Sequence, residues 1–404
     1  MKQKIIIIGG GAAGFFAAIT CAESNPDAEI IILERGNEVL QKVKISGGGR
    51  CNVTHACFDP KDLCEFYPRG KKELLGPFHQ FMTGDTMQWF EERGVALKIE
   101  TDNRVFPISN SSQTIIDVLV NSTEKLGIKI KLNHRVESFE KKGNQWKIST
   151  NQGDFDADKL MIATGSNTKI WNLLEKLGHT IVSPVPSLFT FKINDNRIKK
   201  IPGVSVVNAT VSITNSEFKT NGPLLITHWG MSGPAILKLS AFGAQFLAEK
   251  NYQYNILINW LSKPTQTVFN ELKKTRQEEQ KKQIILRSPF KEIPKRLWEN
   301  LVLASEIKSE SRWADVSNKQ LEKLSIQLTK GIFNANGKAT FKEEFVTAGG
   351  VDLKEINFKK FESKIHKNLF FAGEVLNIDA VTGGFNFQNA WTGGYIVGNS
   401  MAEN

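Results

Sequence analysis

The sequence predicts an α/β protein whose first domain is discontinuous and carries inserted domains. Three observations support this prediction. An aliphatic run at residues 4–8 leads into glycines and an alanine-rich segment, the pattern of a buried parallel strand and its crossover helix. Short strands of alternating polarity dominate residues 187–261, and a charged helical segment follows them to residue 330. Glycine-rich strand sequence then returns, in the style of the N-terminal part.

The expected elements of the first part form a βαβ unit followed by a mixed region. The strand at 4–8, the helix at 11–24 and the strand at 28–34 make up the unit, because both strands are continuously apolar and Asn25-Pro26 ends the helix. The elements expected after it are a helix at 86–95, a helix beginning near 113, and strands at 128–132, 135–140, 146–150 and 159–165.

The character of the sequence changes after Pro184. The strands expected in the mostly β segment are 187–193, 207–214 and 254–260, and those expected near the C-terminus are 343–351 and 367–376, before a last helix. A chain of 404 residues is too long for one ordinary core. We expect the domains to comprise residues 1–186 with 342–404, 187–261 with 331–341, and 262–330.

Composition narrows the class of protein. Hydrophobic residues make up 40% and charged residues 23%, as in ordinary globular proteins. The longest aliphatic run is strand-sized, and no apolar stretch is typical of a signal peptide or a membrane span, so we expect a cytoplasmic protein with no membrane partner. Four cysteines do not form a disulfide framework.

The strongest motif is Gly9-x-Gly11-x-x-Gly14, which follows a strand and opens a helix. Gly9 permits the tight turn, Gly11 lets the backbone approach a pyrophosphate, and Gly14 allows close packing of helix and strand. The helix N-terminus supplies N–H donors for the phosphates. Glu34, at the end of the second strand, is placed to accept hydrogen bonds from an adenosine ribose, which disfavours NADP at this site.

Two later strands favour FAD over NAD as the bound dinucleotide. Residues 160–165 end in Ala-Thr-Gly, and residues 368–376 contain Gly373-Glu374. Both resemble the second and third fingerprints of flavoproteins with two dinucleotide-binding domains. That resemblance implies that the first strand brings backbone near the FAD pyrophosphate and that Glu374 lies beside the ribitol.

The stretch "KVKISGGGRCNVTHAC" at 42–57 allows several interpretations. A metal site would use Cys51, His55, Cys57 and Cys64, but their spacing does not match paired zinc ligands. A redox dithiol would be accompanied by a second GxGxxG, which does not follow Gly165. The third interpretation is a loop that embraces a flavin.

The motifs "KISGGGRCNVT", "FPISNSS", "THWGMSGPAIL", "FVTAGGV" and "FAGEVLNIDAVTGGFNFQNAWTGGYIVG" together resemble the YhiN/BaiN-like family of FAD-dependent oxidoreductases, which includes aminoacetone-oxidase-like flavoproteins. The resemblance covers the whole chain. It implies a Rossmann-like FAD-binding domain with noncovalent FAD, an inserted β-barrel-like substrate domain and an inserted helical domain. The connection 166–176 is shorter than in many relatives, so the resemblance does not define the residues at the mouth of the pocket.

The fingerprints and the resemblance together define the candidate cofactor-binding residues. They are Gly9, Gly11, Ala12, Ala13, Gly14, Glu34, Arg35, Lys44, Ser46, Gly47, Gly48, Gly49, Arg50, Cys51, Asn52, Val136, Ala163, Thr164, Gly165, Gly373, Glu374, Gly383, Gly384, Phe385, Asn386, Gln388 and Ala390. The candidate catalytic residues are His228, as a general acid or base or an orienting group, and the polar residues Asn52 and Thr347. We expect no metal.

The leading hypothesis is an enzyme that exchanges a hydride between flavin N5 and a small organic substrate, with NAD(P)H as a transient electron donor. The alternative enzyme is an oxygen-using oxidase of a small amine. Net charge is +10, and residues 262–330 contain 15 Lys and Arg against nine Asp and Glu, a net charge of +6. A solvated helical surface explains this segment without a nucleic-acid partner, and a flavin-bound, RNA-interacting protein is the hypothesis from another class.

Overall fold

The computed structural model describes residues 2–339 and 346–403, which form two compact units. The first unit comprises the residues up to Pro184 and those from Thr347 onward, and the second runs from Val185 to Val346. The first unit is therefore discontinuous in sequence. The expected boundary between 341 and 342, and the start of the strand expected at 343–351, lie outside the described residues.

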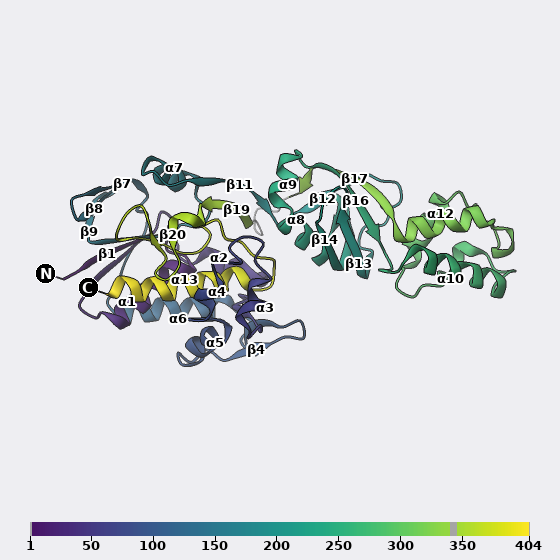
Figure 1. The fold of residues 1–404 in the computed structure, drawn as a ribbon. Helices are drawn as coiled ribbons and strands as arrows, with labels where there is room; N and C mark the ends of the chain where they lie inside the picture. The colour runs from purple at the N-terminus through teal and green to yellow at the C-terminus, as the bar shows by residue number, and fades with distance from the viewer. Residues whose placement is uncertain (1, 340–345, 404) are drawn as a thin grey trace. The chain divides into compact units, whose positions relative to one another are not determined.

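A seven-stranded sheet forms the centre of the first unit (Figure 1). Its order is β20 (Ile356–Asn357), β21 (Glu362–Ser363), β22 (Leu369–Phe371), β10 (Lys159–Ile162), β1 (Lys4–Ile8), β2 (Glu29–Leu33) and β6 (Lys129–Lys131). The strands from β22 to β6 are parallel, and β20 and β21 are antiparallel additions at one edge. The predicted α/β fold with a parallel sheet is confirmed.

Helices α1 (Ala12–Ser24) and α13 (Phe385–Ala402) lie side by side, as the purple and yellow helices of Figure 1 show. Glycine makes this contact possible. A Cβ atom at Gly398 would lie 2.6 Å from the Thr20 Cβ and 2.7 Å from the Ala17 carbonyl oxygen. The two helices therefore pack backbone against backbone, and the beginning and end of the chain share one core.

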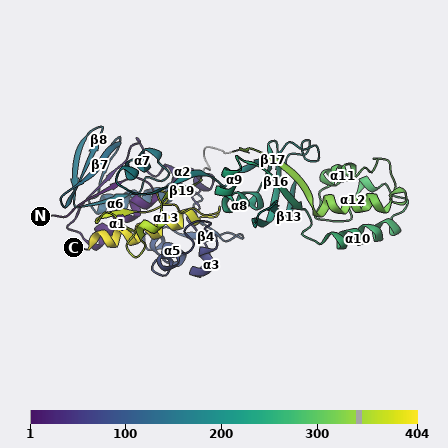
Figure 2. The same cartoon turned by 45° about the horizontal axis from the view of Figure 1, so that its top comes forward.

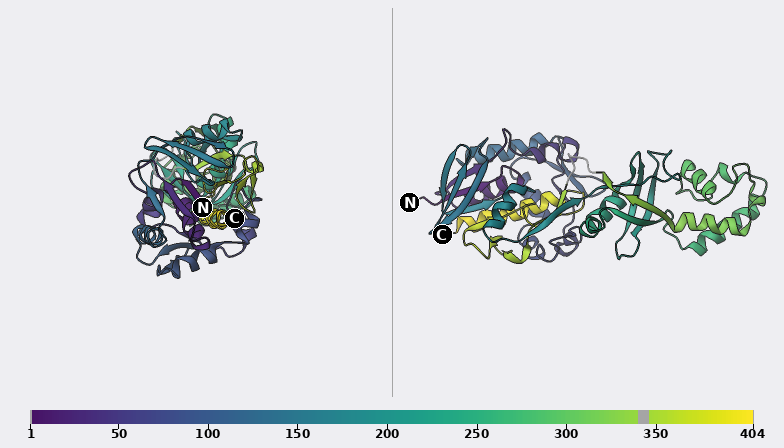
Figure 3. Two further views of the ribbon diagram at one scale, coloured as in Figure 1. Left: turned by 90° about the vertical axis from the view of Figure 1, so that its left-hand side faces the viewer. Right: turned by 90° about the horizontal axis from the view of Figure 1, so that it is seen from above.

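Smaller elements complete the first unit (Figure 3). The three-stranded sheets are β3 (Thr54–His55), β5 (Arg104–Pro107) and β4 (Leu97–Ile99), and β7 (Val136–Lys142), β8 (Gln145–Thr150) and β9 (Gly153–Ala157). The further helices are α2 (Gln41–Gly49), α3 (Pro60–Cys64), α4 (Leu75–Phe78), α5 (Thr83–Glu91), α6 (Ser112–Lys125), α7 (Thr168–Lys176) and the 3-10 turn η3 (Leu353–Glu355). Strands β11 (Ile181–Ser187) and β19 (Val346–Val351), which contain the two sequence boundaries of this unit, form a two-stranded sheet.

The second unit is built on a seven-stranded antiparallel sheet. Its order is β17 (Gly331–Asn336), β16 (Gln253–Asn259), β13 (Ser205–Ile213), β14 (Lys219–Thr227), β15 (Gly230–Ser232), β12 (Thr190–Lys192) and β18 (Lys338–Ala339). Helices α8 (Pro234–Phe242) and α9 (Ala244–Glu249) interrupt the segment expected to be mostly β. Gly233 precedes Pro234 at the first helical position, which is a typical helix start.

Helices α10 (Thr265–Glu278), α11 (Lys295–Ala304) and α12 (Asn318–Thr329) gather at one end of this sheet (Figure 2). They share a continuous hydrophobic core with it, because Trp260 from the sheet side and Trp298 from α11 belong to the same buried cluster. The division of this unit into a barrel-like and a helical domain stays a prediction. Among the described residues, no helix has the length and apolar character needed to cross a membrane.

A buried polar network connects three segments of the first unit. The His179 imidazole is fully buried, and its Nδ1 lies 2.8 Å from Glu355 Oε2 while its Nε2 lies 3.1 Å from Ser363 Oγ. Glu355 also accepts a hydrogen bond from the Thr180 N–H. Burial lowers the pKa of His179, although the carboxylate opposes this shift. The neutral imidazole therefore fits the network, with Nδ1–H donating to Glu355.

This network should make the protein less stable in mild acid. Because the pKa of His179 is lower when folded than the value of about 6.5 in the unfolded chain, the unfolded state binds more protons below that pH. The stabilisation is present above about pH 6.5 and decreases as the pH falls toward the folded-state pKa. Between about pH 8 and about pH 5.5, the free energy of unfolding measured with urea should decrease more in the wild type than in His179→Gln. An equal loss in both would exclude His179 as the responsible group.

Candidate cofactor site

The carboxyl ends of four parallel strands meet at one edge of the first sheet. The candidate residues follow these ends: Gly9 after β1, Glu34 after β2, Thr164 after β10 and Gly373 after β22. In open α/β sheets, ligands bind at this edge. The structure therefore brings together residues that lie more than 350 positions apart in the sequence.

The turn between β1 and α1 requires glycine at two positions and leaves space at a third. Gly9 has φ +114°, and a Cβ atom there would lie 2.4 Å from the Ala163 carbonyl oxygen. A Cβ atom at Gly14 would lie 2.1 Å from the Gly9 carbonyl oxygen. A Cβ atom at Gly11 would have no protein atom within 4 Å. Gly9 and Gly14 are required for close packing, and Gly11 faces an open volume at the start of α1.

Glu34 is held in place by two backbone amides. Its Oε2 accepts a hydrogen bond of 2.8 Å from Gly10 N–H, and its Oε1 accepts one of 2.8 Å from Gly36 N–H. The Glu34 carbonyl accepts from His134 N–H, which brings the beginning of β7 and the buried Val136 toward this turn. Arg35 is exposed. The carboxylate is thus fixed beside the glycine turn.

The stretch that begins at Gln41 is a helix that breaks at its glycines. Ser46 has extended backbone, and Gly47, Gly48 and Gly49 have φ of +57°, +69° and +82°. Cβ atoms at Gly48 and Gly49 would have no neighbour within 4 Å. The loop therefore exposes unobstructed backbone, as close approach to a ligand requires. The Lys44 ammonium lies 3.3 Å from Glu38.

The side chains that follow this loop are engaged by the protein. The Arg50 guanidinium lies 2.7 Å from Glu100 Oε1 and 4.0 Å from the centre of the Phe106 ring. Asn52 lies 2.9 Å from Gly384 N and 3.0 Å from Thr54 O, with its amide oriented to accept from the first and donate to the second. Both side chains fix the loop against neighbouring segments, and their predicted cofactor contacts stay predictions.

The loop before α13 closes against the same region. Gly383 and Gly384 have φ of +134° and +94°, and a Cβ atom at Gly384 would lie 2.6 Å from the Thr54 carbonyl oxygen. The Asn386 side chain bonds both the N–H and the carbonyl of Ala380. The N-terminus of the 18-residue helix α13 therefore has a fixed direction, and its dipole stabilises negative charge near the first turn.

Gln388 is buried inside a hydrogen-bond network. Its Oε1 accepts from Thr54 Oγ1 at 2.6 Å and from Thr86 Oγ1 at 3.1 Å, and its Nε2 donates to Thr392 Oγ1 at 3.1 Å. Ala390 is also buried in the helix. We propose that Gln388 fixes α13 to β3 and α5, so that its predicted part in the site is indirect.

Lys42, which the sequence did not single out, forms an ion pair with Glu374. Gly165 lies beside both, since a Cβ atom there would be 3.6 Å from Glu374 Oε2 and 3.9 Å from Lys42 Nζ. The only sequence signal was a lysine just before the glycine-rich loop. Three segments of the first unit thus converge on the acidic residue that was expected beside the ribitol.

These residues fit an FAD molecule. Open space adjoins Gly11, Gly48 and Gly49. The hydroxyl of Thr164, in the second fingerprint, is buried and has no hydrogen-bond partner among the described residues. A buried hydroxyl without a partner is costly, so a ligand atom that bonds it would be favourable. Open glycine backbone and an unpaired hydroxyl at one sheet edge are what a bound dinucleotide would use.

The cysteines have no thiolate character. Burial raises the pKa of Cys51 to about 12, and burial raises the pKa of Cys64 to about 11. Burial also raises the pKa of Cys57. A thiol protonated at neutral pH is a poor nucleophile. All four cysteines are free, and within the described residues no group of three or more His, Cys, Asp and Glu is arranged to hold a metal ion.

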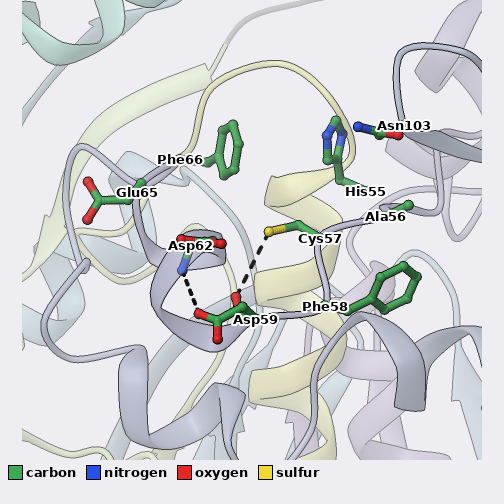
Figure 4. A pocket seen from close by; sticks show the side chains of 9 residues that line it. All are labelled: His55, Ala56, Cys57, Phe58, Asp59, Asp62, Glu65, Phe66 and Asn103. Atoms are coloured by element: carbon green, nitrogen blue, oxygen red, sulfur yellow. Dashed lines mark hydrogen bonds between the residues drawn. The ribbon is translucent and has the colours of Figure 1, made fainter.

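A cavity of about 470 Å³ lies beside the loop before α13 (Figure 4). In that view the Phe66 and His55 rings lie in the upper part, with their centres 5.7 Å apart, and the Cys57 thiol points toward Asp59. His55 Nδ1 is 3.1 Å from the Gly383 carbonyl oxygen, and Phe66 stacks on Phe385 with ring centres 4.2 Å apart. The aromatic wall of the cavity, formed by His55 and Phe66, is thus attached to the loop that contains Gly383.

The other two catalytic candidates lie in different places. Thr347 is buried in β19 of the first unit. His228 belongs to the second unit, where it is exposed in the turn between β14 and β15 next to the exposed Trp229. Their catalytic roles stay predictions.

The parallel sheet and its glycine turn define the class of protein as a Rossmann-type dinucleotide-binding protein. A family model described as "HI0933-like protein Rossmann domain" matches residues 3–400. The chain belongs to this family, which is the YhiN/BaiN-like family of FAD-dependent oxidoreductases expected from the sequence.

Two curated relatives match nearly the whole chain. A 3-dehydro-bile acid delta(4,6)-reductase of Clostridium scindens is 26% identical over 99% of both chains. A ribosomal RNA dihydrouridine synthase of Escherichia coli is 28% identical over 96% of this chain and 95% of the relative. The solved 3-ketosteroid-delta4-(5alpha)-dehydrogenase of Rhodococcus jostii shares the fold, with a TM-score of 0.51, 11% identity and coverage of 100% of this chain and 97% of that one.

Proposed function

We propose that the protein is an FAD-dependent reductase of a carbon–carbon double bond conjugated to a carbonyl group. The observation that carries the proposal is the open glycine backbone at the carboxyl edge of the sheet, next to the unpaired Thr164 hydroxyl. This arrangement suits a cofactor that carries the redox chemistry.

The chain's own residues would hold the cofactor and leave the chemistry to it. The backbone at Gly11 and the N-terminus of α1 would bind the pyrophosphate, Glu34 the adenosine ribose, and Glu374 the ribitol. The N-terminus of α13 would stabilise negative charge on the flavin ring. When bound and reduced, FAD supplies a hydride from N5. The binding is proposed to be noncovalent.

The two relatives' names describe chemically similar substrates. A delta(4,6) bile acid with a 3-oxo group has double bonds conjugated to that carbonyl, and the uracil double bond that becomes saturated in dihydrouridine is conjugated to a carbonyl as well. In both substrates, the group that would accept the hydride is a carbon–carbon double bond conjugated to a carbonyl. Within this class we favour a uracil ring in RNA, because the charge of +10 attracts a polyanion more strongly than the single carboxylate of a bile acid. The aromatic wall of His55 and Phe66 would stack such a ring.

Purified protein should show a flavin absorption spectrum, and NADH or NADPH should bleach it under anaerobic conditions. Stopped-flow mixing measures the rate of bleaching by each nucleotide. Reoxidation of the bleached protein by a uridine-containing RNA or by an enone such as 4-androstene-3,17-dione would identify the acceptor. Absence of bleaching by either nucleotide, with bleaching by a small amine, would replace the reductase by an amine oxidase.

A further inference from the structure

We infer that two paired loops of the second unit, residues 280–287 and 308–315, form a docking surface for the phosphate backbone of RNA. This inference rests on the proposed function for its partner, but it concerns a surface outside the cofactor site. We call this surface the basic loops. The first loop connects α10 to α11 and contains η1 (Ile284–Leu286), and the second precedes α12 and contains η2 (Trp313–Asp315).

Backbone hydrogen bonds hold the basic loops side by side. Ile284 N–H donates to Ser311 O at 3.1 Å, and Trp313 N–H donates to Lys282 O at 3.0 Å. Gln283 and Arg312 form an antiparallel bridge. Side chains of directly opposite residues share a face, so Gln283 and Arg312 project from the same face.

Buried tryptophans anchor this pair of loops to the core. The Trp298 indole N–H donates to the Ile284 carbonyl at 2.8 Å, and the Trp298 and Trp313 rings lie 6.4 Å apart. Ile284 and Trp298 are fully buried, and Trp313 is 2% exposed. The surface cations are therefore carried on an ordered backbone, which reduces the entropy that a ligand must overcome in binding them.

The charge of the basic loops is one-sided. They contain five Lys and Arg against two acidic residues, Glu310 and Asp315. Lys281, Arg287, Lys308 and Arg312 are exposed, and none of the four forms an ion pair within the described residues. By contrast, Lys274, Lys295 and Lys323 of the neighbouring helices each have an acidic partner. Four exposed cations without an ion pair among the described residues thus lie on the two loops.

A polyanion with a repeating phosphate suits this surface best. Cations that lie next to one another and have no acidic partner release counterions when phosphates replace them, and this makes binding strong at low salt. The loops are not an amphipathic helix, the element by which proteins commonly lie on membranes. RNA docking of this kind requires no base recognition, so the basic loops would supply affinity and leave the choice of uridine to the cofactor unit.

The test compares two triple variants of the complete, FAD-loaded protein. Lys281→Glu/Arg287→Glu/Arg312→Glu changes the basic loops. Lys219→Glu/Lys238→Glu/Lys250→Glu makes the same change of charge at three exposed lysines elsewhere in the second unit. A fluorescein-labelled RNA hairpin with uridines in its loop is the probe. Fluorescence anisotropy at several salt concentrations gives Kd and its salt dependence, and circular dichroism verifies folding.

The first variant should bind about 30-fold more weakly at low salt, and its slope of log Kd against log salt should fall by about 2, as expected when three phosphate contacts are lost. The control should stay within about threefold of the wild type. Equal weakening in both variants, or no RNA binding by the wild type, would overturn the inference, as would binding to phosphatidylserine vesicles in preference to RNA. Flavin bleaching by NADPH is measured separately, so a failure of the proposed reductase function is distinguishable from a failure of the docking surface.

Discussion

Replacing Gly11 with valine should give a folded protein that does not retain FAD. Gly11 has extended backbone, φ −97° and ψ −172°, which valine adopts without strain, and its Cβ position has no protein neighbour within 4 Å. The side chain would occupy the volume assigned to the pyrophosphate. We expect FAD affinity to fall at least about 100-fold, or about 2.7 kcal/mol. The free energy of unfolding of the apoprotein should change by about 1 kcal/mol or less, the cost of a poorer N-cap.

Visible absorbance of the purified variant measures FAD, and urea unfolding of both apoproteins measures stability. Gly14→Val is the matched control, because its Cβ would lie 2.1 Å from the Gly9 carbonyl oxygen and should prevent the βαβ unit from forming. Gly11→Val should thus fold without FAD, whereas Gly14→Val should not fold. A Gly11→Val protein that retains FAD at the wild-type level would show that the cofactor does not lie at this turn.

Replacing Asp379 with alanine should cost about 3–5 kcal/mol in the free energy of unfolding, a large part of the stability of an ordinary domain. The Asp379 side chain is fully buried, and its two oxygens accept hydrogen bonds from Nε and Nη2 of Arg69, which is 13% exposed. Removal of the carboxylate leaves a buried guanidinium without its anionic partner. This pair connects the loop after α3 to the loop before α13, so FAD retention should fall as well.

The urea midpoint measures this loss. Glu137→Ala, which breaks an exposed pair with Arg135, is the control and should leave the midpoint nearly unchanged. Asp379→Asn keeps the shape of the side chain and should fall between the wild type and Asp379→Ala. If the midpoint of Asp379→Ala equals that of Glu137→Ala, the buried pair does not stabilise the fold.

Elements with a local signal were predictable from the sequence. After their first residues, Lys4 and Lys159, strands β1 and β10 are continuously apolar because both of their faces are buried in a parallel sheet. The glycines of the β1–α1 turn are likewise dictated by backbone geometry within a few residues. Helix α8 was missed because it lies among short strands, although Gly233-Pro234 indicated its start.

The polar contacts of the site depend on distant residues and could not be predicted. Gln388 bonds Thr54 and Thr86, which lie 334 and 302 positions away. Arg50 was expected to contact the cofactor, but the residue type alone did not show that Glu100 pairs with it. Lys42 gains its significance only from the fold, which brings it beside Glu374. Such pairs follow from the tertiary fold, so a sequence motif identifies the neighbourhood of the site and not the partners of each side chain.

The packing of α1 against α13 has a consequence for biosynthesis. Strand β1 and helix α1 leave the ribosome well before α13, which begins more than 350 residues further along the chain. The N-terminal half of this core must therefore wait, with its apolar face uncovered, until α13 has been made. The second unit is contiguous in sequence and can fold earlier as a separate body. Contacts between the two ends of a chain form slowly because of the entropy of closing the intervening loop, so completion of the flavin unit is expected to be the last and slowest step of maturation.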